Sequence, residues 1–260
     1  MNTITFYKYQ GTGNDFIIID NRNLTFPKEN ISLIAKLCNR NFGIGADGLM
    51  LIEKSDSYDF KMVYFNADGN IGSMCGNGGR CIVALAYKLN IISSKTTFEA
   101  IGNIYHANIE NNIISLNMND VNNIELQEDY VFLNTGSPHH VTFEENLTNL
   151  NVAEKGKKIR EGSPYFKEGT NVNFVEQVNK NTFKVRTYER GVEGETLSCG
   201  TGVTAVAIAS HQLKKTKQNT IILQTLGGDL EVGFKTNNNC YTNITLKGPA
   251  TFVFKGEIKF

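Results

Sequence analysis

The sequence predicts an α+β protein made of two similar halves. Short runs that alternate apolar and polar residues dominate the chain, helical patterns are few, and one strand–turn–helix pattern occurs twice. Strands and helices do not alternate as they do in parallel βαβ folds, so we expect antiparallel sheets around a few apolar helices. The clearest expected strands are 4–9, 16–20, 60–65, 112–118, 182–188, 220–225 and 244–248.

Three segments have the spacing of apolar residues that is typical of helices. They are 30–39, 77–90 and 201–213. The first places Ile34 and Cys38 on one apolar stripe, and the other two each follow a Cys-Gly-x-Gly sequence.

The repeated pattern covers 60–86 and 183–209, and each copy reads strand, Gly-containing turn, Cys-Gly-x-Gly and apolar helix. The two copies start 123 residues apart, and two Thr-Gly tripeptides, at 12–14 and 135–137, are separated by the same 123 residues. The strand–turn–helix pattern and the tripeptides thus repeat in the same order and at the same distance. This agreement indicates a duplicated chain with pseudo-twofold symmetry.

The duplication suggests where the two domains divide. We expect an N-terminal half, 1–117 plus 250–260, that carries Cys75, and a C-terminal half, 118–249, that carries Cys199. A twofold axis would bring the two cysteines to an active site in the interdomain cleft.

Composition narrows the class of protein and its compartment. The 260 residues include 26 basic and 26 acidic side chains, so general binding of nucleic acid by a basic surface is not expected. No apolar run is long enough to cross a membrane, and the first residues lack the pattern of a signal peptide. Five cysteines, an odd number, argue against a disulfide framework, so we expect thiols and a cytoplasmic location.

Cys75 and Cys199 each directly precede Gly-x-Gly and a helix. A thiol at a helix N-terminus is favoured as the thiolate, and glycine amides there can face a carboxylate ligand. A thiolate and a thiol on opposite faces of one carbon supply the base and the acid that inversion needs. The sequence therefore predicts an amino-acid racemase or epimerase.

Two other kinds of site are not supported. The G-x-G-x-x-G at 43–48 has a helical pattern before it and a strand-like run after it, the reverse of a dinucleotide site. Cys75 and Cys81 lack the spacing of a zinc site. We expect neither a metal nor another cofactor.

Seven segments carry a specific resemblance. They are GTGNDFIIID (11–20), NFGIGADG (41–48), FNADG (65–69), CGNGGRC (75–81), GSPHHV (136–141), YERGVEGET (188–196) and SCGTG (198–202). In this order they resemble the signature blocks of the diaminopimelate epimerase family. The resemblance implies two α+β domains, each with an antiparallel barrel-like sheet around a central helix. It also implies epimerisation of L,L-2,6-diaminoheptanedioate to the meso form, for lysine and peptidoglycan synthesis, without pyridoxal phosphate.

The resemblance also implies roles for individual residues. Cys75 and Cys199 would be the acid–base pair, with His139 near the thiols and Glu189 facing the substrate ammonium. The reacting carboxylate would be held by Gly76, Asn77, Gly200 and Thr201, and the distal end by Asn14, Asn66, Asn171 and Arg190. Two positions depart from the family pattern: Ser137 replaces an Asn that is frequent there, and Gly48 replaces a Gln of some members.

Several alternatives stay open on the sequence alone. The chain could be another racemase of this superfamily, for proline, hydroxyproline or histidine, or a thiol redox switch that uses Cys75 and Cys199, or a non-catalytic binder of amino acids. Cys38 and Cys81 are interpreted as core residues, and Cys240 is given no role. Family members are commonly homodimers, which is the oligomeric state that the resemblance implies.

Overall fold

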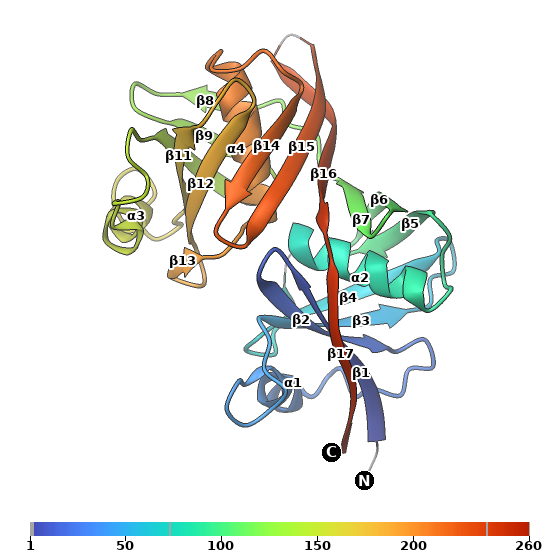
Figure 1. The fold of residues 1–260 in the computed structure, drawn as a ribbon. Coiled ribbons are helices and arrows are strands. Elements are labelled where there is room, and N and C mark those ends of the chain that lie inside the picture. The colour runs from blue at the N-terminus through green and yellow to red at the C-terminus, as the bar shows by residue number, and fades with distance from the viewer. Residues whose placement is uncertain (1–2, 73, 238, 260) are drawn as a thin grey trace. The chain divides into compact units, whose positions relative to one another are not determined.

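The structure is a computed structural model that describes residues 3–72, 74–237 and 239–259. The chain divides into two compact units (Figure 1). Unit 1 comprises Met1–Leu116 and Gly248–Phe260, and unit 2 comprises Asn117–Lys247. Both N- and C-terminal segments therefore belong to unit 1, and unit 2 is inserted between them.

The sheet of unit 1 begins at the last strand of the chain and then follows the order of the sequence. β17 pairs with β1, and the ladder continues through β2 to β7. The strands are β17 (Thr251–Lys259), β1 (Thr3–Gly11), β2 (Asn14–Asp20), β3 (Gly48–Glu53), β4 (Phe60–Asn66), β5 (Lys95–Ala100), β6 (Asn103–Glu110) and β7 (Ile113–Asn117). In Figure 1 the red β17 runs beside the blue β1.

Unit 2 repeats this arrangement with its own strands. The ladder runs β8, β9, β10, β11, β12, β14, β15, β16, and the short β13 pairs with β12. The strands are β8 (Ile124–Leu126), β9 (Val131–Asn134), β10 (Pro138–Phe143), β11 (Asn171–Gln177), β12 (Thr182–Glu189), β13 (Gly194–Thr196), β14 (Thr220–Thr225), β15 (Gly228–Asn237) and β16 (Cys240–Pro249).

The two units share one sequence of strand directions. Most pairs are antiparallel, as expected, but β2–β3 and β4–β5 in unit 1 are parallel, and so are β10–β11 and β12–β14 in unit 2. Each parallel pair falls at the same step of its ladder. This agreement supports the duplication that the repeated motifs indicate.

A helix lies in the connection between the strands of each parallel pair, because parallel neighbours need a crossover. α1 (Ile31–Cys38) and α3 (Val152–Glu161) connect the first parallel pair of each unit, and α2 (Gly76–Lys88) and α4 (Gly200–Gln212) the second. The predictions of helices at 30–39, 77–90 and 201–213 are confirmed. The sequence analysis missed α3, which lies in a polar segment.

The cores form where α2 and α4 pack against their own sheets. α2 contacts β1, β2, β3 and β6, whereas α4 contacts strands from β9 to β15. α4 is buried from Gly202 to Ser210, as expected of a helix that is apolar on all sides. Cys38 and Cys81 are buried, as predicted, and Cys240 begins β16. Among the described residues, no helix combines the length and the apolar character needed to span a membrane.

Candidate active site

Cys75 is the N-cap residue of α2, with its backbone in the extended region. Its Sγ accepts a hydrogen bond from the backbone N–H of Gly78 at 3.5 Å. Asn14, at the start of β2, brings its side-chain Oδ1 to 3.5 Å from both Cys75 Sγ and Asn77 Nδ2. Three residues of the predicted site therefore meet at one point of unit 1, where the amides of the first helical turn favour negative charge.

Asn14 is held in place by a carboxylate that the sequence analysis did not assign to the site. Its Nδ2 donates to Asp47 Oδ2 at 2.5 Å. The same carboxylate accepts from the backbone N–H of Asp15 at 3.2 Å and from Arg40 Nη2 at 2.7 Å. An ionised carboxylate only accepts hydrogen bonds, so Asp47 fixes which end of the Asn14 amide faces Cys75.

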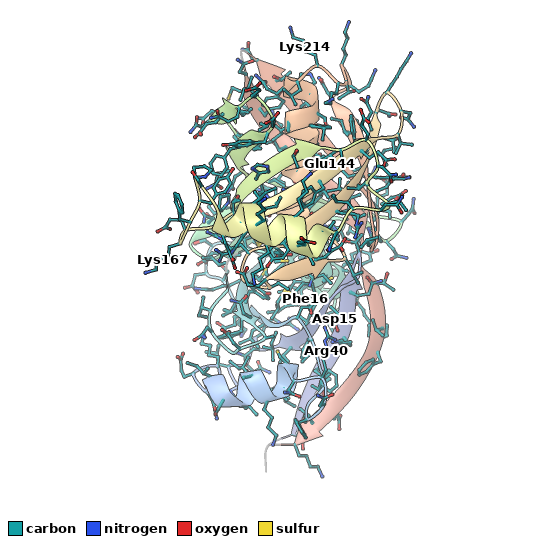
Figure 2. The ribbon with its side chains drawn as sticks, turned by 90° about the vertical axis from the view of Figure 1, so that its left-hand side faces the viewer. Asp15, Phe16, Arg40, Glu144, Lys167 and Lys214 are labelled. Atoms are coloured by element: carbon teal, nitrogen blue, oxygen red, sulfur yellow. The ribbon has the colours of Figure 1, made fainter. Side chains whose placement is uncertain are left out.

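Asp15 extends this network into a cluster of charges (Figure 2). Arg40 donates to both of its carboxylate oxygens, at 2.7 and 3.1 Å, and the buried Lys8 pairs with it at 2.6 Å. Burial opposes ionisation of Asp15, but hydrogen bonds from Arg40 and Lys8 lower its pKa to about 2. The carboxylate is therefore charged at any physiological pH.

Asn66 reaches the same edge of the sheet through strand register. It ends β4 opposite Gly48, and Gly48 begins β3 opposite Phe16 of β2. A Cβ at Gly48 would lie 2.5 Å from the ring of Tyr64. The ring of Tyr64 thus occupies space that a longer side chain at position 48 would need.

Cys199 is the N-cap residue of α4 and is 8% exposed. Its Sγ lies 3.4 Å from Thr201 Oγ1, and that hydroxyl lies 2.9 Å from His139 Nε2. His139 therefore reaches the thiol through Thr201. Unit 2 collects three residues of the predicted site around its helix start, as unit 1 does.

Asn173 sets which ring nitrogen of His139 carries the proton. Its Oδ1 accepts from Thr187 at 3.0 Å, so its Nδ2 faces His139 Nδ1 at 3.2 Å and the carbonyl oxygen of His140 at 3.1 Å. Nδ1 of His139 must then accept, which leaves the proton on Nε2 toward Thr201. Burial, aided by the positive charge of Arg190, lowers the pKa of His139 to about 3, so the ring is neutral.

The expected distal-end residues of unit 2 contact one another. Asn171 begins β11; its Oδ1 accepts from the backbone N–H of Arg190 at 2.9 Å, and its Nδ2 donates to Ser137 Oγ at 2.9 Å. Arg190 Nη1 donates to the carbonyl oxygen of Glu168 at 3.0 Å. Ser137, one of the two positions that depart from the family pattern, is therefore a hydrogen-bond partner of Asn171. Glu189 is the last residue of β12, a position equivalent to that of Asn66 on β4.

Comparison with known proteins assigns the family. The model of the family described as diaminopimelate epimerase matches residues 6–122 and 131–253. A diaminopimelate epimerase of Flavobacterium psychrophilum is 60% identical over 253 residues, which cover 97% of this chain and 99% of that protein. One from Aquifex aeolicus is 38% identical, with 97% of each chain covered.

The chain belongs to the diaminopimelate epimerase family.

As a member of the diaminopimelate epimerase family the chain is an isomerase, as predicted. Solved structures support the fold. A phenazine biosynthesis protein of the PhzF family from Bacillus anthracis superposes with a TM-score of 0.79 at 16% identity, over 100% of both chains. A hydroxyproline epimerase from Agrobacterium vitis gives 0.71 at 12% identity, covering 98% of this chain and 92% of the other. At these identities the likeness concerns the fold alone.

Two residues of this epimerase fold were missed as partners of the site. Asp47 lies inside the Gly-rich block 41–48, where its spacing to other motifs gave no reason to single it out. Asn173 lies two residues after Asn171 and shares its face of β11, since side chains alternate along a strand. That periodicity could have indicated Asn173 once Asn171 was placed.

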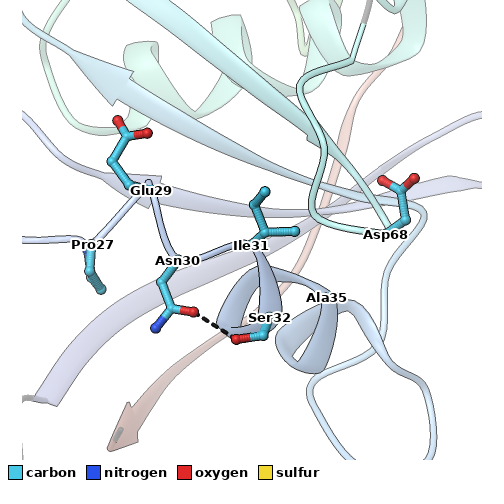
Figure 3. Close-up of a pocket in the computed structure, with 7 residues that line it drawn as sticks. All are labelled: Pro27, Glu29, Asn30, Ile31, Ser32, Ala35 and Asp68. Atoms are coloured by element: carbon cyan, nitrogen blue, oxygen red, sulfur yellow. Dashed lines mark hydrogen bonds between the residues drawn. The ribbon is translucent and has the colours of Figure 1, made fainter.

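An open surface pocket lies elsewhere on unit 1 (Figure 3). Among its lining residues are Asn30 and Ser32 at the start of α1, where Ser32 Oγ donates to Asn30 Oδ1 at 2.9 Å, and Asp68 of the β4 turn. Its recorded lining includes none of the residues expected at the active site. We assign the pocket no part in the chemistry of the thiols.

Proposed function

We propose that the protein converts L,L-2,6-diaminoheptanedioate to the meso form by inverting one α-carbon with Cys75 and Cys199. The observation that carries the proposal is that both cysteines cap buried helices at equivalent places in two units of the same topology. The relative with 60% identity over nearly the whole chain supports the substrate.

The reaction needs one proton removed and one added. A thiolate takes the α-proton from one face of the substrate, and the thiol of the other cysteine gives its proton to the opposite face. After one turnover the two sulfurs have exchanged protonation states, so the pair titrates as a coupled system. Pyridoxal phosphate and metal have no part in the proposed steps.

The α-proton of an amino acid is far less acidic than a thiol, so negative charge must be stabilised as the proton leaves. We propose that the carboxylate of the reacting centre binds the amides of Gly76 and Asn77 together with those of Gly200 and Thr201. Each pair belongs to the first turn of its helix, where backbone N–H groups have no intrahelical acceptor.

The distal end of the substrate, which does not react, carries its own ammonium and carboxylate. We propose that Asn14, Asn66, Asn171 and Arg190 bind this end, and that Glu189 faces the ammonium. The fork of Arg190 suits a carboxylate because it can donate to both oxygens at once. A substrate without this second group would leave these residues unused, which is why diaminopimelate is preferred to proline.

The test incubates the reduced protein with L,L-diaminopimelate in deuterium oxide. We expect the meso isomer to form with deuterium at one α-carbon. Cys75→Ala and Cys199→Ala should each slow inversion more than about a hundredfold, since general acid–base groups contribute about 10² to 10⁴. Cys240→Ala is the matched control, because it removes a half-buried thiol at the start of β16 and should leave the rate unchanged.

Three outcomes would contradict this function. Near-normal inversion by either active-site variant would exclude the two-thiol mechanism. Binding of diaminopimelate by the reduced protein without any exchange of the α-proton would indicate a binding protein. Inversion of proline under the same conditions, with none of diaminopimelate, would move the chain to another substrate class.

We place the activity in the cytoplasm because the mechanism needs free thiols. A reducing compartment keeps cysteines as thiols. Fractionation of cells should recover the protein with the cytosol, and recovery from an exported fraction would contradict this placement.

We also propose that the protein is a homodimer in which β17 of one copy pairs with β17 of another. Within the described residues β17 has one recorded strand partner, β1. Its consecutive residues Phe252, Val253 and Phe254 are all exposed, so apolar groups lie on both faces of an edge strand. Sedimentation should give a dimer, and Val253→Lys should give a monomer; a monomeric parent protein would refute the proposal.

A further inference from the structure

Arg80 is a buried cation on the helix that Cys75 caps, and it contacts the residue next to Cys75, Gly76. It lies on the second turn of α2, its residue is 0% exposed, and the acceptors of its guanidinium among the described residues are neutral groups. These are the carbonyl oxygen of Gly76 at 3.3 Å, Thr12 Oγ1 at 3.2 Å and the carbonyl oxygen of Pro249 at 3.4 Å. No ion pair recorded for residues 3–72, 74–237 and 239–259 includes Arg80.

A buried charge without an opposite charge is costly, so it needs a counter-ion. Burial lowers the pKa of Arg80, and the negative charges of Cys81 and Cys75 oppose that shift. Arginine keeps its proton at physiological pH because its ordinary pKa is above 12. Cys81 is no counter-ion, because full burial raises its own pKa well above the ordinary range. Cys75 is left as the group whose ionised form would balance Arg80.

The equivalent position in unit 2 holds no cation. Arg80 is five residues after Cys75, and five residues after Cys199 the chain has Thr204. Thr204 Oγ1 donates to the carbonyl oxygen of Gly200 at 2.9 Å, as Arg80 donates to that of Gly76. The duplicated helices therefore keep the same hydrogen bond and differ in charge.

The charged and titratable groups that the structure describes near the two helix starts are paired, neutral or partly exposed. In unit 1, Asp15 on β2 is paired with Lys8 and Arg40, and burial raises the pKa of Tyr9 on β1 to about 12, so the phenol is neutral. In unit 2, His139 is neutral, and Arg190 is half-buried and therefore partly screened by solvent.

Hydrogen bonds to the two sulfurs are weaker influences than a buried charge. Cys75 Sγ accepts from the N–H of Gly78 and lies near Asn14 Oδ1, both at 3.5 Å, and these two contacts favour opposite protonation states. Cys199 Sγ lies 3.4 Å from Thr201 Oγ1, and because that oxygen accepts from His139 Nε2 its hydroxyl donates to the sulfur, a single neutral contact that favours the thiolate. The full positive charge of the buried Arg80 acts over a longer distance than any of these contacts.

We propose that Arg80 makes the two thiols unequal, so that in the substrate-free protein Cys75 is the thiolate and Cys199 is the thiol. Arg80 is a positioning residue, since it acts through Cys75 and not on the substrate. The consequence of this inequality for catalysis rests on the proposed function. The isomer that presents its α-proton to Cys75 meets a thiolate base at once, whereas the isomer that presents it to Cys199 meets a thiol.

The experiment measures each thiol alone by the rate of alkylation with iodoacetamide against pH. Cys199→Ser leaves Cys75 and Cys75→Ser leaves Cys199, and peptide mass spectrometry reads the modified cysteine. We expect half-maximal reactivity of Cys75 at a pH lower by about one unit or more, which is about a tenfold larger thiolate fraction at neutral pH. If the pH of half-maximal alkylation were equal for the two thiols, or lower for Cys199, the proposal would be overturned. Arg80 is present in both proteins of this comparison.

Variants of Arg80 then test the cause. In the Cys199→Ser background, Arg80→Met should raise the midpoint of Cys75 by about one unit, whereas Arg80→Lys, which keeps the charge, should retain most of the effect. Thr204→Val in the Cys75→Ser background is the matched control and should leave Cys199 unchanged. A folded Arg80→Met protein with an unchanged midpoint would refute the role of Arg80. Alkylation needs no substrate, so it tests the inequality of the two thiols independently of whether the protein epimerises diaminopimelate.

Discussion

Asn14 and Asp47 are joined by a 2.5 Å hydrogen bond from the side-chain amide to the carboxylate. Asp47 is in turn held by Arg40, so the amide oxygen of Asn14 has one stable direction, toward Cys75 and Asn77. The orientation of a proposed substrate-binding residue thus depends on a carboxylate to which the sequence analysis gave no role.

Asp47→Ala should therefore weaken substrate binding by allowing the Asn14 amide to turn. We expect KM for L,L-diaminopimelate to rise about tenfold, which corresponds to one hydrogen bond of about 1.4 kcal/mol, with a smaller change in kcat. Steady-state kinetics of the deuterium exchange would measure both. Asp47→Asn keeps an acceptor oxygen and should be affected less; an unchanged KM in Asp47→Ala would show that Asn14 keeps its orientation without Asp47.

Gly78 and Gly202 occupy equivalent positions, three residues after each cysteine, but differ in the space around them. A Cβ at Gly202 would lie 2.5 Å from Asn173 Oδ1, whereas a Cβ at Gly78 would lie 3.1 Å from the flexible sulfur of Met50. We expect Gly202→Ala to lower the free energy of unfolding by about 1–3 kcal/mol through overpacking. In Gly78→Ala the better helix propensity of alanine should offset much of the smaller clash.

Urea unfolding of the two glycine variants would measure this difference. Gly202→Ala should also lose more activity, because Asn173 holds His139. Equal stability of the two variants would mean that the space around the two helix starts is the same in solution.

The stability of the protein should fall on acidification because two buried histidines are neutral. Burial lowers the pKa of His139 to about 3, and burial with the charge of Lys155 lowers that of His140 to about 4, from an ordinary value of 6.5. Below pH 6.5 the unfolded chain binds protons that the folded chain does not. Each histidine should therefore reduce the free energy of unfolding by up to about 1.4 kcal/mol per pH unit between pH 6.5 and 4.

Urea unfolding at pH 7, 6 and 5 measures this slope. His139→Gln should be less stable at pH 7 but should lose stability less steeply as the pH falls. His106→Gln, at an exposed position of β6, is the control and should keep the slope of the parent protein. A parent protein whose stability does not change from pH 7 to 5 would contradict the neutral, buried state of the histidines.

The sequence predicted the parts of the fold that have strong local patterns. The helices at Cys75 and Cys199 and the duplication followed from short motifs, because the same buried helix recurs in each unit. α3 was missed since Gly156 and several lysines obscure its pattern; it packs through Gly156, where a Cβ would lie 2.4 Å from Tyr188. Parallel pairing was missed because it depends on crossovers that propensity does not specify.

The site was predicted less completely than the helices. Residues in the motifs could be assigned by resemblance, but Asp47, Asn173 and Arg80 act through contacts between distant segments. Arg80 lies within the quoted motif 75–81, yet its burial and its neutral partners depend on Thr12 and Pro249. Such contacts follow from tertiary structure and have no local signal.

Because β1 pairs with β17, unit 1 is begun before unit 2 but receives its last strand after unit 2 has been synthesised. Thr3 lies opposite Lys259, so β1, which pairs with β2 within unit 1, gains its second neighbour only after the whole of unit 2 has been synthesised. Unit 2, whose residues are contiguous, has its whole sequence available before that point. A nascent chain held just before β17 would therefore carry a complete second unit, while the first unit still lacked its outermost strand.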